Sequence, residues 1–337
     1  MVLYWVAFLA IVTLLYVLLD GFDLGVGILS AGARSDANRN AMMNAIAPVW
    51  DGNETWLVAT GVVLWGAFPI VYATLLSAFY LPLLFMLAGL ILRGVAFEFR
   101  HRTDRCRWLW DASFGLGSLV AAFMQGVTVG ALVEGLPIAN GRYSGGEFGW
   151  LSTFSILCGI GLCVGYCLLG ASWLVRTCDG EVRDLARRLI PRLAIGLFVF
   201  LLTVFAFALL KDLRIMDRWV ERPYLLVFPA VGAVAAVRLA TGILSRSDRI
   251  PFPMVALIFA AAFATLAISF WPYMIPFSIT IDAAAAPHSS LSFMFWGVGL
   301  FIFPLTLVHT AINYSVFKRV PPPPEPQRDK QRASLWS

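Results

Sequence analysis

The first 30 residues read MVLYWVAFLAIVTLLYVLLDGFDLGVGILS, and residues 2–30 form one apolar run with two carboxylates, Asp20 and Asp23, near its end. A helix needs about 20 apolar residues to cross the roughly 30 Å hydrocarbon core of a bilayer. This run meets that length. It has no basic region before it and no clear small-residue cleavage site, so we interpret it as an uncleaved membrane-spanning helix rather than a signal peptide.

The composition of all 337 residues agrees with a membrane protein. Hydrophobic residues make up 60% of the chain and charged residues 13%, against about 25% charged in a soluble globular protein. So few charges cannot form a water-facing surface, which excludes a soluble enzyme and a nucleic-acid-binding protein. The 12 Trp and 26 Phe fit a bilayer, where aromatic side chains gather at the interfaces. We therefore expect an all-α polytopic protein surrounded by membrane lipid.

Apolar runs of spanning length recur along the whole chain, and their unbroken character favours helices over the strands of a β-barrel. We expect nine transmembrane helices at residues 2–30, 54–74, 76–98, 110–133, 149–175, 190–210, 223–244, 251–275 and 291–317. No long linker or internal repeat is visible, so residues 1–320 are predicted to form a single transmembrane domain. Residues 321–337 are Pro-rich and charged, which predicts a disordered cytoplasmic tail.

Lys and Arg are unevenly divided between the two sides of these spans. The odd-numbered connections and the C-terminus carry 18 of the 25, whereas the N-terminus and the even-numbered connections carry five. Arg93 and Arg238 lie inside spans and complete the count. Positively charged loops stay in the cytoplasm. The N-terminus is therefore predicted to be periplasmic and the C-terminus cytoplasmic.

Three polar motifs fall in the cytoplasmic half of the membrane under this orientation. The first predicted helix ends in DGFDLGVG (20–27), the second begins around PVWDGNETW (48–56), and the third ends in RGVAFEFR (93–100). The glycines of the first motif allow the backbone of another helix to approach closely. Ionisable groups at membrane depth are costly, and they usually mark a pathway or a buried partner.

The spacing of the charges suggests a chemistry. Asp20 and Asp23 are three residues apart, as are Asp51 and Glu54, so each pair shares a helix face. Two neighbouring carboxylates cannot both ionise comfortably in a low dielectric, so one of them is expected to hold a transferable proton. Arg93 is the expected counter-charge. A string of such groups is typical of a proton or cation route, but a structural ion-pair cluster that fixes helix packing is an open alternative.

Two further kinds of residue are candidates for cofactor or metal binding. His309, in the last predicted span, could ligate a haem, although a lone membrane histidine more often hydrogen-bonds a neighbouring helix. The five cysteines lack the spacing of metal ligands, so we predict no metal site.

The three motifs, in this order, resemble subunit II of cytochrome bd-type quinol oxidases. The sequences APVWDGNETWL (47–57) and RGVAFEFR (93–100) are most similar to those of the cyanide-insensitive branch of that family. The segment WPYMIPFSITIDAAAAPHSSLSF (271–293) and the ending NYSVFKRV (313–320) also fit, although the Ala-rich stretch with His288 is less typical. The resemblance covers essentially the whole chain.

The resemblance implies a terminal quinol:oxygen oxidoreductase of the aerobic respiratory chain, in the bacterial plasma (inner) membrane. It implies that haems b558, b595 and d are held by subunit I, with which this chain forms a heterodimer, and that the chain is not active alone. It implies two four-helix bundles plus one peripheral helix. Complexes of the family can also hold a structural quinone and a small single-helix accessory subunit.

The resemblance also implies roles for individual residues. Asp51 matches the acidic residue of a proton route from the cytoplasm to the oxygen-reducing haems, and Asp20, Asp23 and Arg93 lie in the same region. With Glu54, which shares a helix face with Asp51, these are the candidate proton-pathway residues.

Two functions from other classes stay open at the level of sequence. A cation-coupled secondary transporter would predict inverted repeats and interrupted helices in both halves of the chain, whereas the charged motifs cluster in the first three spans. A purely structural scaffold for subunit I is compatible with every pattern above.

Overall fold

The computed structural model describes residues 1–102, 106–139, 142–210 and 222–316, and the chain is almost entirely helical. The expected all-α membrane class is confirmed, since eight helical segments of the described part are long and apolar enough to cross a membrane. They are α1 (Val2–Ser30), α5 (Tyr80–Phe99), α6 (Arg107–Glu134), α7 (Thr153–Thr177), α8 (Gly180–Leu210), η2 (Pro223–Leu226) with α10 (Val227–Leu244), α11 (Pro251–Phe270), and a final stack of α13 (His288–Met294), the π-helix η3 (Phe295–Ile302) and α14 (Phe303–Val316).

The second predicted span is interrupted, so the described part of the chain does not show nine unbroken spanning helices. α3 (Trp50–Ala67) ends before Phe68, and α4 (Pro69–Ala78) follows directly. Proline lacks the backbone N–H that a helix interior needs, and its ring clashes with the preceding turn. Pro69 therefore breaks the helix at a point where hydrophobicity alone shows no change.

Several boundaries and short elements also differ from the predicted spans. α11 ends at Phe270 rather than 275, because Trp271 and Pro272 lead into β3 (Tyr273–Ile275), which pairs antiparallel with β4 (Ile279–Thr280). The connections also contain elements that hydrophobicity did not predict. They are α2 (Asp36–Asn44), η1 (Arg100–Arg102), the strands β1 (Ile138–Ala139) and β2 (Arg142–Tyr143), and α12 (Ile281–Ala284). The predicted tail, residues 321–337, lies outside the described residues.

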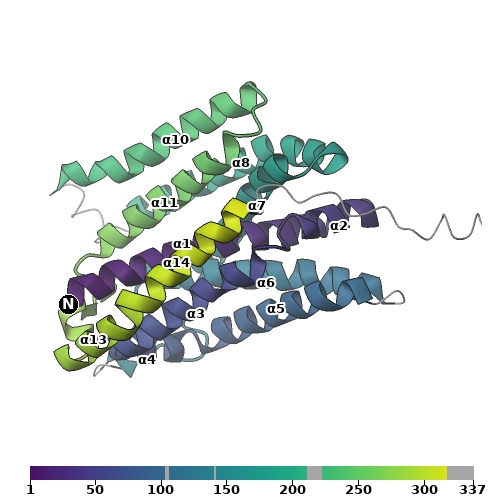
Figure 1. The fold of residues 1–337 in the computed structure, drawn as a ribbon. Helices are drawn as coiled ribbons and strands as arrows, with labels where there is room; N and C mark the ends of the chain where they lie inside the picture. Colours follow the sequence, from purple (N-terminus) through teal and green to yellow (C-terminus); the bar gives the residue numbers. More distant parts are fainter. Residues whose placement is uncertain (103–105, 140–141, 211–221, 317–337) are drawn as a thin grey trace, which may run out of the picture.

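α1 is the central helix of the molecule. It packs against α3, α6 and α7, while α5 pairs with α6, α8 with α7, and α10 with α11. The helices run lengthwise side by side, and α14 crosses the face formed by α1 and α3 (Figure 1). Gly25 shows why the glycine motif is needed, since a Cβ there would lie 1.8 Å from the backbone oxygen of Tyr166 in α7.

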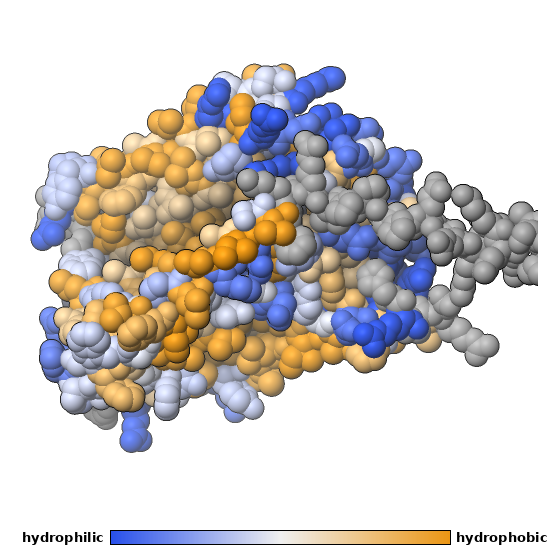
Figure 2. All heavy atoms as spheres, viewed as in Figure 1, coloured by the Kyte–Doolittle hydropathy of each residue, from blue (hydrophilic) through white to orange (hydrophobic). Residues whose placement is uncertain are grey.

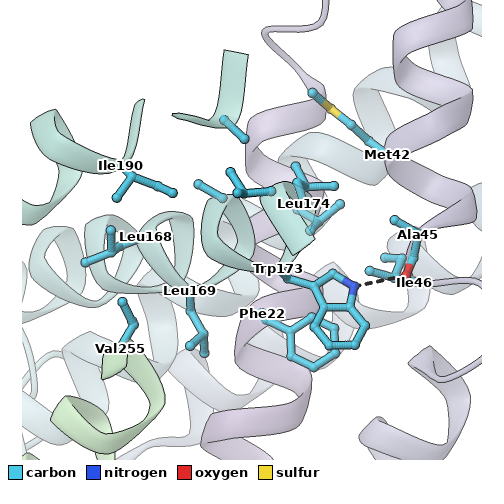
Figure 3. Close-up of a cluster of buried hydrophobic side chains, with 14 of the residues drawn as sticks. Phe22, Met42, Ala45, Ile46, Leu168, Leu169, Trp173, Leu174, Ile190 and Val255 are labelled. Carbon is cyan, nitrogen blue, oxygen red and sulfur yellow. Dashed lines mark hydrogen bonds between the residues drawn. The ribbon is translucent and has the colours of Figure 1, made fainter. Parts of the chain in front are cut away.

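The largest buried apolar cluster joins α1 and α7 to the end of α2. The Trp173 ring stacks on Phe22 with 4.5 Å between ring centroids, and its indole N–H donates to the carbonyl oxygen of Ala45 at 3.0 Å (Figure 3). This contact fixes the residues that lead into α3, and with them the start of the second polar motif.

The surface has the two regions expected of a membrane protein. Apolar side chains cover much of the visible length of the helices, and hydrophilic side chains gather at the end that holds α2 (Figure 2). Because α2 and the starts of α6 and α8 carry many of the arginines counted above, this is the end that the charge count predicts to be cytoplasmic.

Candidate functional site

α1, α3 and α5 bring three of the predicted charged residues into one buried cluster. The Nη2 atom of Arg93 lies 2.7 Å from Oδ1 of Asp20 and 3.2 Å from Oε1 of Glu54. The side chains of Asp20 and Arg93 are 0% and 1% exposed, whereas that of Glu54 is 27% exposed. The arginine therefore bridges two carboxylates from different helices, and Glu54 connects the cluster to the surface of the chain.

Asp23 joins the same cluster through a neutral residue. The amide of Asn53 donates to Oδ2 of Asp23 at 2.8 Å and to the carbonyl oxygen of Leu19 at 3.2 Å. The hydroxyl of Tyr314, near the end of α14, donates to Oδ1 of Asn53 at 2.9 Å. α14 thereby also contacts the cluster, through Asn53 of α3.

Sequence reasoning missed both neutral members. Asn53 lies within the second motif, between the two acidic residues, and its position there was the available signal. Tyr314 has no local signal, because its partner Asn53 is 261 residues away along the chain.

Asp51 does not join the buried contacts. It is exposed on the second residue of α3, and its carboxylate has no ion pair within the described part of the chain. It lies within electrostatic range of Glu54, one turn further along the helix. The structure thus brings together Asp20, Asp23, Glu54 and Arg93 and places Asp51 at the surface beside them.

The cluster carries more acidic groups than basic ones. Three carboxylates, those of Asp20, Asp23 and Glu54, face the single guanidinium of Arg93 in the described residues. Oδ2 of Asp20, Oδ1 of Asp23 and Nη1 of Arg93 are buried without a hydrogen-bond partner there. Uncompensated buried charge is costly, so the arrangement favours a proton on at least one carboxylate. Chemically, the cluster can take up and release a proton.

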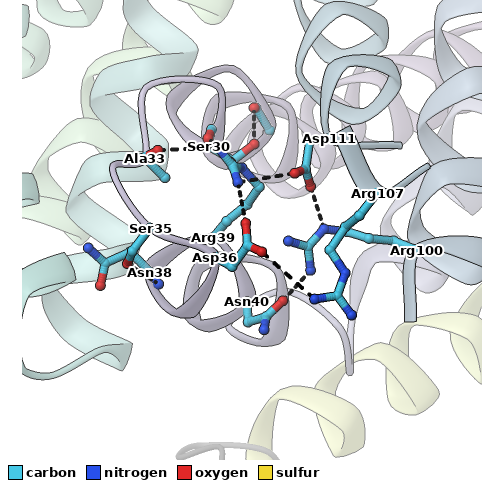
Figure 4. A network of polar contacts seen from close by, with 11 residues as sticks. Ser30, Ala33, Ser35, Asp36, Asn38, Arg39, Asn40, Arg100, Arg107 and Asp111 are labelled. Carbon is cyan, nitrogen blue, oxygen red and sulfur yellow. Dashed lines mark hydrogen bonds and ion pairs between the residues drawn. The ribbon is translucent and has the colours of Figure 1, made fainter. Parts of the chain in front are cut away.

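A second polar network holds α2 against the ends of α5 and α6 (Figure 4). Arg39 pairs with Asp36 at 3.0 Å and with Asp111 at 3.1 Å. Arg100, which is 1% exposed, pairs with the same Asp111 and donates to Asn40. These contacts join groups from three helices, and sequence reasoning missed them. They fix the position of α2 and contain none of the predicted pathway residues.

His309 is exposed on α14, and it has no hydrogen bond within the described residues. The expectation that it bonds a neighbouring helix is therefore not met inside this chain. An exposed side chain on a single helix does not by itself enclose a haem.

Comparison with known proteins identifies the family of this chain and a solved structure with the same fold. The model of the family described as cytochrome bd terminal oxidase subunit II matches residues 1–317. The chain is 32% identical to the "Probable cytochrome oxidase subunit 2" of Haemophilus influenzae, over 94% of this chain and 92% of that protein. It is 30% identical to the "Cytochrome bd-I ubiquinol oxidase subunit 2" of Escherichia coli K12, over 94% of each. The solved bd oxidase of Geobacillus thermodenitrificans has the same fold, with a TM-score of 0.72 at 20% identity, over 92% of this chain and 98% of that one.

Proposed function

Because the chain belongs to the cytochrome bd terminal oxidase subunit II family, we propose that it packs on a haem-bearing subunit I and supplies a proton route from the cytoplasm. The complex would transfer electrons from quinol to dioxygen and form quinone and water. Subunit I would hold haems b558, b595 and d, as the family resemblance implies. The structural quinone and the single-helix accessory subunit are predictions that rest on the family alone.

Polar groups on the outer faces of α3 and α14 support the packing on subunit I. Asp51 and His309 are exposed, and Glu54 is partly exposed, on helices whose other outward residues are largely apolar. Ionisable groups at membrane depth face a protein partner or a water-filled cavity rather than lipid. We therefore propose that subunit I covers this face. We also propose that α3 and α4 together form the ninth crossing, within the family arrangement of two four-helix bundles and one further helix.

The buried cluster is the observation that carries the proton route. With the α2 end in the cytoplasm, Asp51 lies at the entry and Glu54 follows one turn deeper, where it contacts Arg93. Arg93 links Glu54 to Asp20, and Asn53 links the cluster to Asp23. The excess of carboxylate over guanidinium gives the cluster a site for a proton. In this route Asp51 collects protons and Glu54 passes them to the buried carboxylates.

Replacement of the two entry carboxylates tests this route. Asp51→Asn and Glu54→Gln keep shape and hydrogen-bonding capacity but remove the transferable proton. We expect haem incorporation to survive while quinol-driven oxygen consumption falls, by about 10²-fold in the double variant, since general acid–base groups contribute about 10²–10⁴. The control is Asp248→Asn, whose carboxylate pairs with Arg187 at the surface. Full activity in the double variant, with assembly intact, would leave the cluster as structural charge in a scaffold subunit.

A further inference from the structure

Two tyrosines and a glutamine form a hydrogen-bonded chain beside the buried cluster. The Gln125 amide nitrogen, on α6, lies 2.6 Å from the hydroxyl oxygen of Tyr16 on α1. The hydroxyl of Tyr166, on α7, donates to Oε1 of the same glutamine at 2.9 Å. Tyr16 and Tyr166 are 5% and 1% exposed. Three helices thus meet through one amide in a water-excluded place.

The hydrogen-bonded residues Tyr16, Gln125 and Tyr166 lie close to Asp20. Tyr16 is one helical turn before Asp20 on α1, on the same face. The Tyr166 ring packs on the neighbouring backbone, since a Cβ on Gly21 would lie 2.6 Å from its Cε1 atom. Both tyrosine side chains thus lie beside the segment of α1 that carries Asp20. The glycine after Asp20 therefore admits an aromatic hydroxyl at the cluster, which is a second use of the glycine motif besides helix approach.

The hydrogen bonds among these three residues run in one direction, from Tyr166 to Gln125 and from Gln125 to Tyr16. Oε1 of Gln125 accepts the Tyr166 proton, so the amide N–H₂ must face Tyr16 and donate to it. Tyr16 then accepts with its oxygen, and its own proton is left to point elsewhere. No acceptor for that proton is found among the described residues, and Oδ2 of Asp20, one turn away, lacks a donor.

We infer that Gln125 is a positioning residue of the proton route, which directs the hydroxyl proton of Tyr16 towards Asp20 and so stabilises its carboxylate. No direct hydrogen bond joins the Tyr16 hydroxyl to Oδ2 of Asp20 among the described residues, so the contact would run through one bridging water molecule. Hydrogen bonds to a carboxylate favour its ionised form. The role rests on the proposed function and deepens it, because Gln125 would hold in place the hydroxyl donor that lies next to the Asp20 carboxylate on the proton route.

The other groups around Asp20 define what Gln125 adds. Arg93 faces it from α5, Glu54 from α3, and Asp23 from its own helix α1. Tyr166 of α7 packs beside Gly21, the residue after Asp20, and Tyr314 of α14 bonds Asn53. α6 contributes a neutral amide to this arrangement. Replacing Gln125 therefore changes the hydrogen bonding at Asp20 without changing the number of charges around it.

Infrared titration of the assembled oxidase complex tests the inference. The carboxyl band of Asp20 is identified as the band that Asp20→Asn removes, and it is followed between acid and neutral pH. In Gln125→Leu we expect the protonation midpoint of that band to rise by about one pH unit, the equivalent of 1.36 kcal/mol. Tyr166→Phe should shift it less but in the same direction, because the amide loses the contact that orients it. Tyr4→Phe is the control, since its hydroxyl donates to the Gly299 carbonyl at 3.2 Å, at the other end of α1.

The outcomes separate this inference from the proposed function. An unchanged midpoint in both Gln125→Leu and Tyr166→Phe, with the Asp20 band present, would overturn the positioning role and leave the route intact. If Asp20→Asn changes neither the spectrum nor the oxygen consumption, the proton role of Asp20 itself fails. Should Gln125→Leu not assemble, Tyr166→Phe alone decides, since it removes one hydroxyl and keeps the ring that packs on Gly21.

Discussion

Arg93 is the residue on which the buried cluster depends. Without it, the fully buried carboxylate of Asp20 and the partly exposed carboxylate of Glu54 lose their shared counter-charge. Removing one partner of a buried ion pair costs about 3–5 kcal/mol. We therefore expect Arg93→Leu to lower the apparent melting temperature and the yield of the assembled complex.

Arg102→Leu is the matched control for that change. Arg102 pairs with Glu98 one turn away, but both side chains are more than half exposed, at 71% and 58%. Exposed ion pairs contribute little to stability. Equal melting temperatures for the two variants would show that the buried cluster does not hold α1, α3 and α5 together.

At the residue scale, charge was predictable and its neutral partners were not. Arg93 was recognised from the sequence because a lone arginine inside a span requires an acidic partner. Gln125 carries no comparable signal, since an isolated amide is tolerated in many helices, and Asn53 was signalled only by its place within the second motif. Gln125 meets Tyr16 across 109 residues of sequence, and only the packing of α1, α6 and α7 brings them together.

At the scale of elements, the approach of α7 to α1 depends on Gly25. A Cβ there would overlap the backbone oxygen of Tyr166 at 1.8 Å, and a backbone atom cannot move as a flexible side chain can. Overpacking a tight contact typically costs about 1–3 kcal/mol, and we expect Gly25→Ala to cost at least that. Reduced assembly of the complex and a lower melting temperature would show this loss of stability.

Gly94→Ala in α5 serves as the control for this prediction. Its added Cβ would lie 3.7 Å from the Trp50 side chain, which is ordinary van der Waals contact. Alanine also favours a helix over glycine, by about 1 kcal/mol. Gly94→Ala should therefore assemble normally. Equal stability of both variants would contradict the close approach of α1 and α7.

The helices themselves were largely predictable, and their interruptions were less so. Long apolar runs gave α1, α6 and α7 with ends within a few residues, because hydrophobicity over about 20 residues is a strong signal. The break at Pro69 was missed because the run around it is apolar on both sides. α2 was missed because it is short and polar, and because it is held by long-range contacts through Arg39 and Arg100.

At the scale of the whole molecule, the charge count predicts the orientation. The C-terminal segment carries five of the 18 inner-face charges. Alkaline phosphatase fused after Val320 should therefore be inactive, because it folds only in the periplasm. The same reporter inserted after Gly146, in the connection that follows β2, should be active. The reverse pattern would place the carboxylate cluster on the periplasmic side and remove its connection to the cytoplasm.

Proton uptake from the cytoplasmic side is the most direct readout of the role proposed for this subunit. It can be measured during quinol oxidation by the assembled complex in vesicles, with Asp20→Asn compared to the natural chain and to Asp248→Asn. We expect Asp20→Asn to slow uptake by about 10²-fold with haem content unchanged, while Asp248→Asn behaves as the natural chain. Normal uptake in Asp20→Asn, with the haems in place, would contradict the proposed role and place the proton route outside the buried cluster.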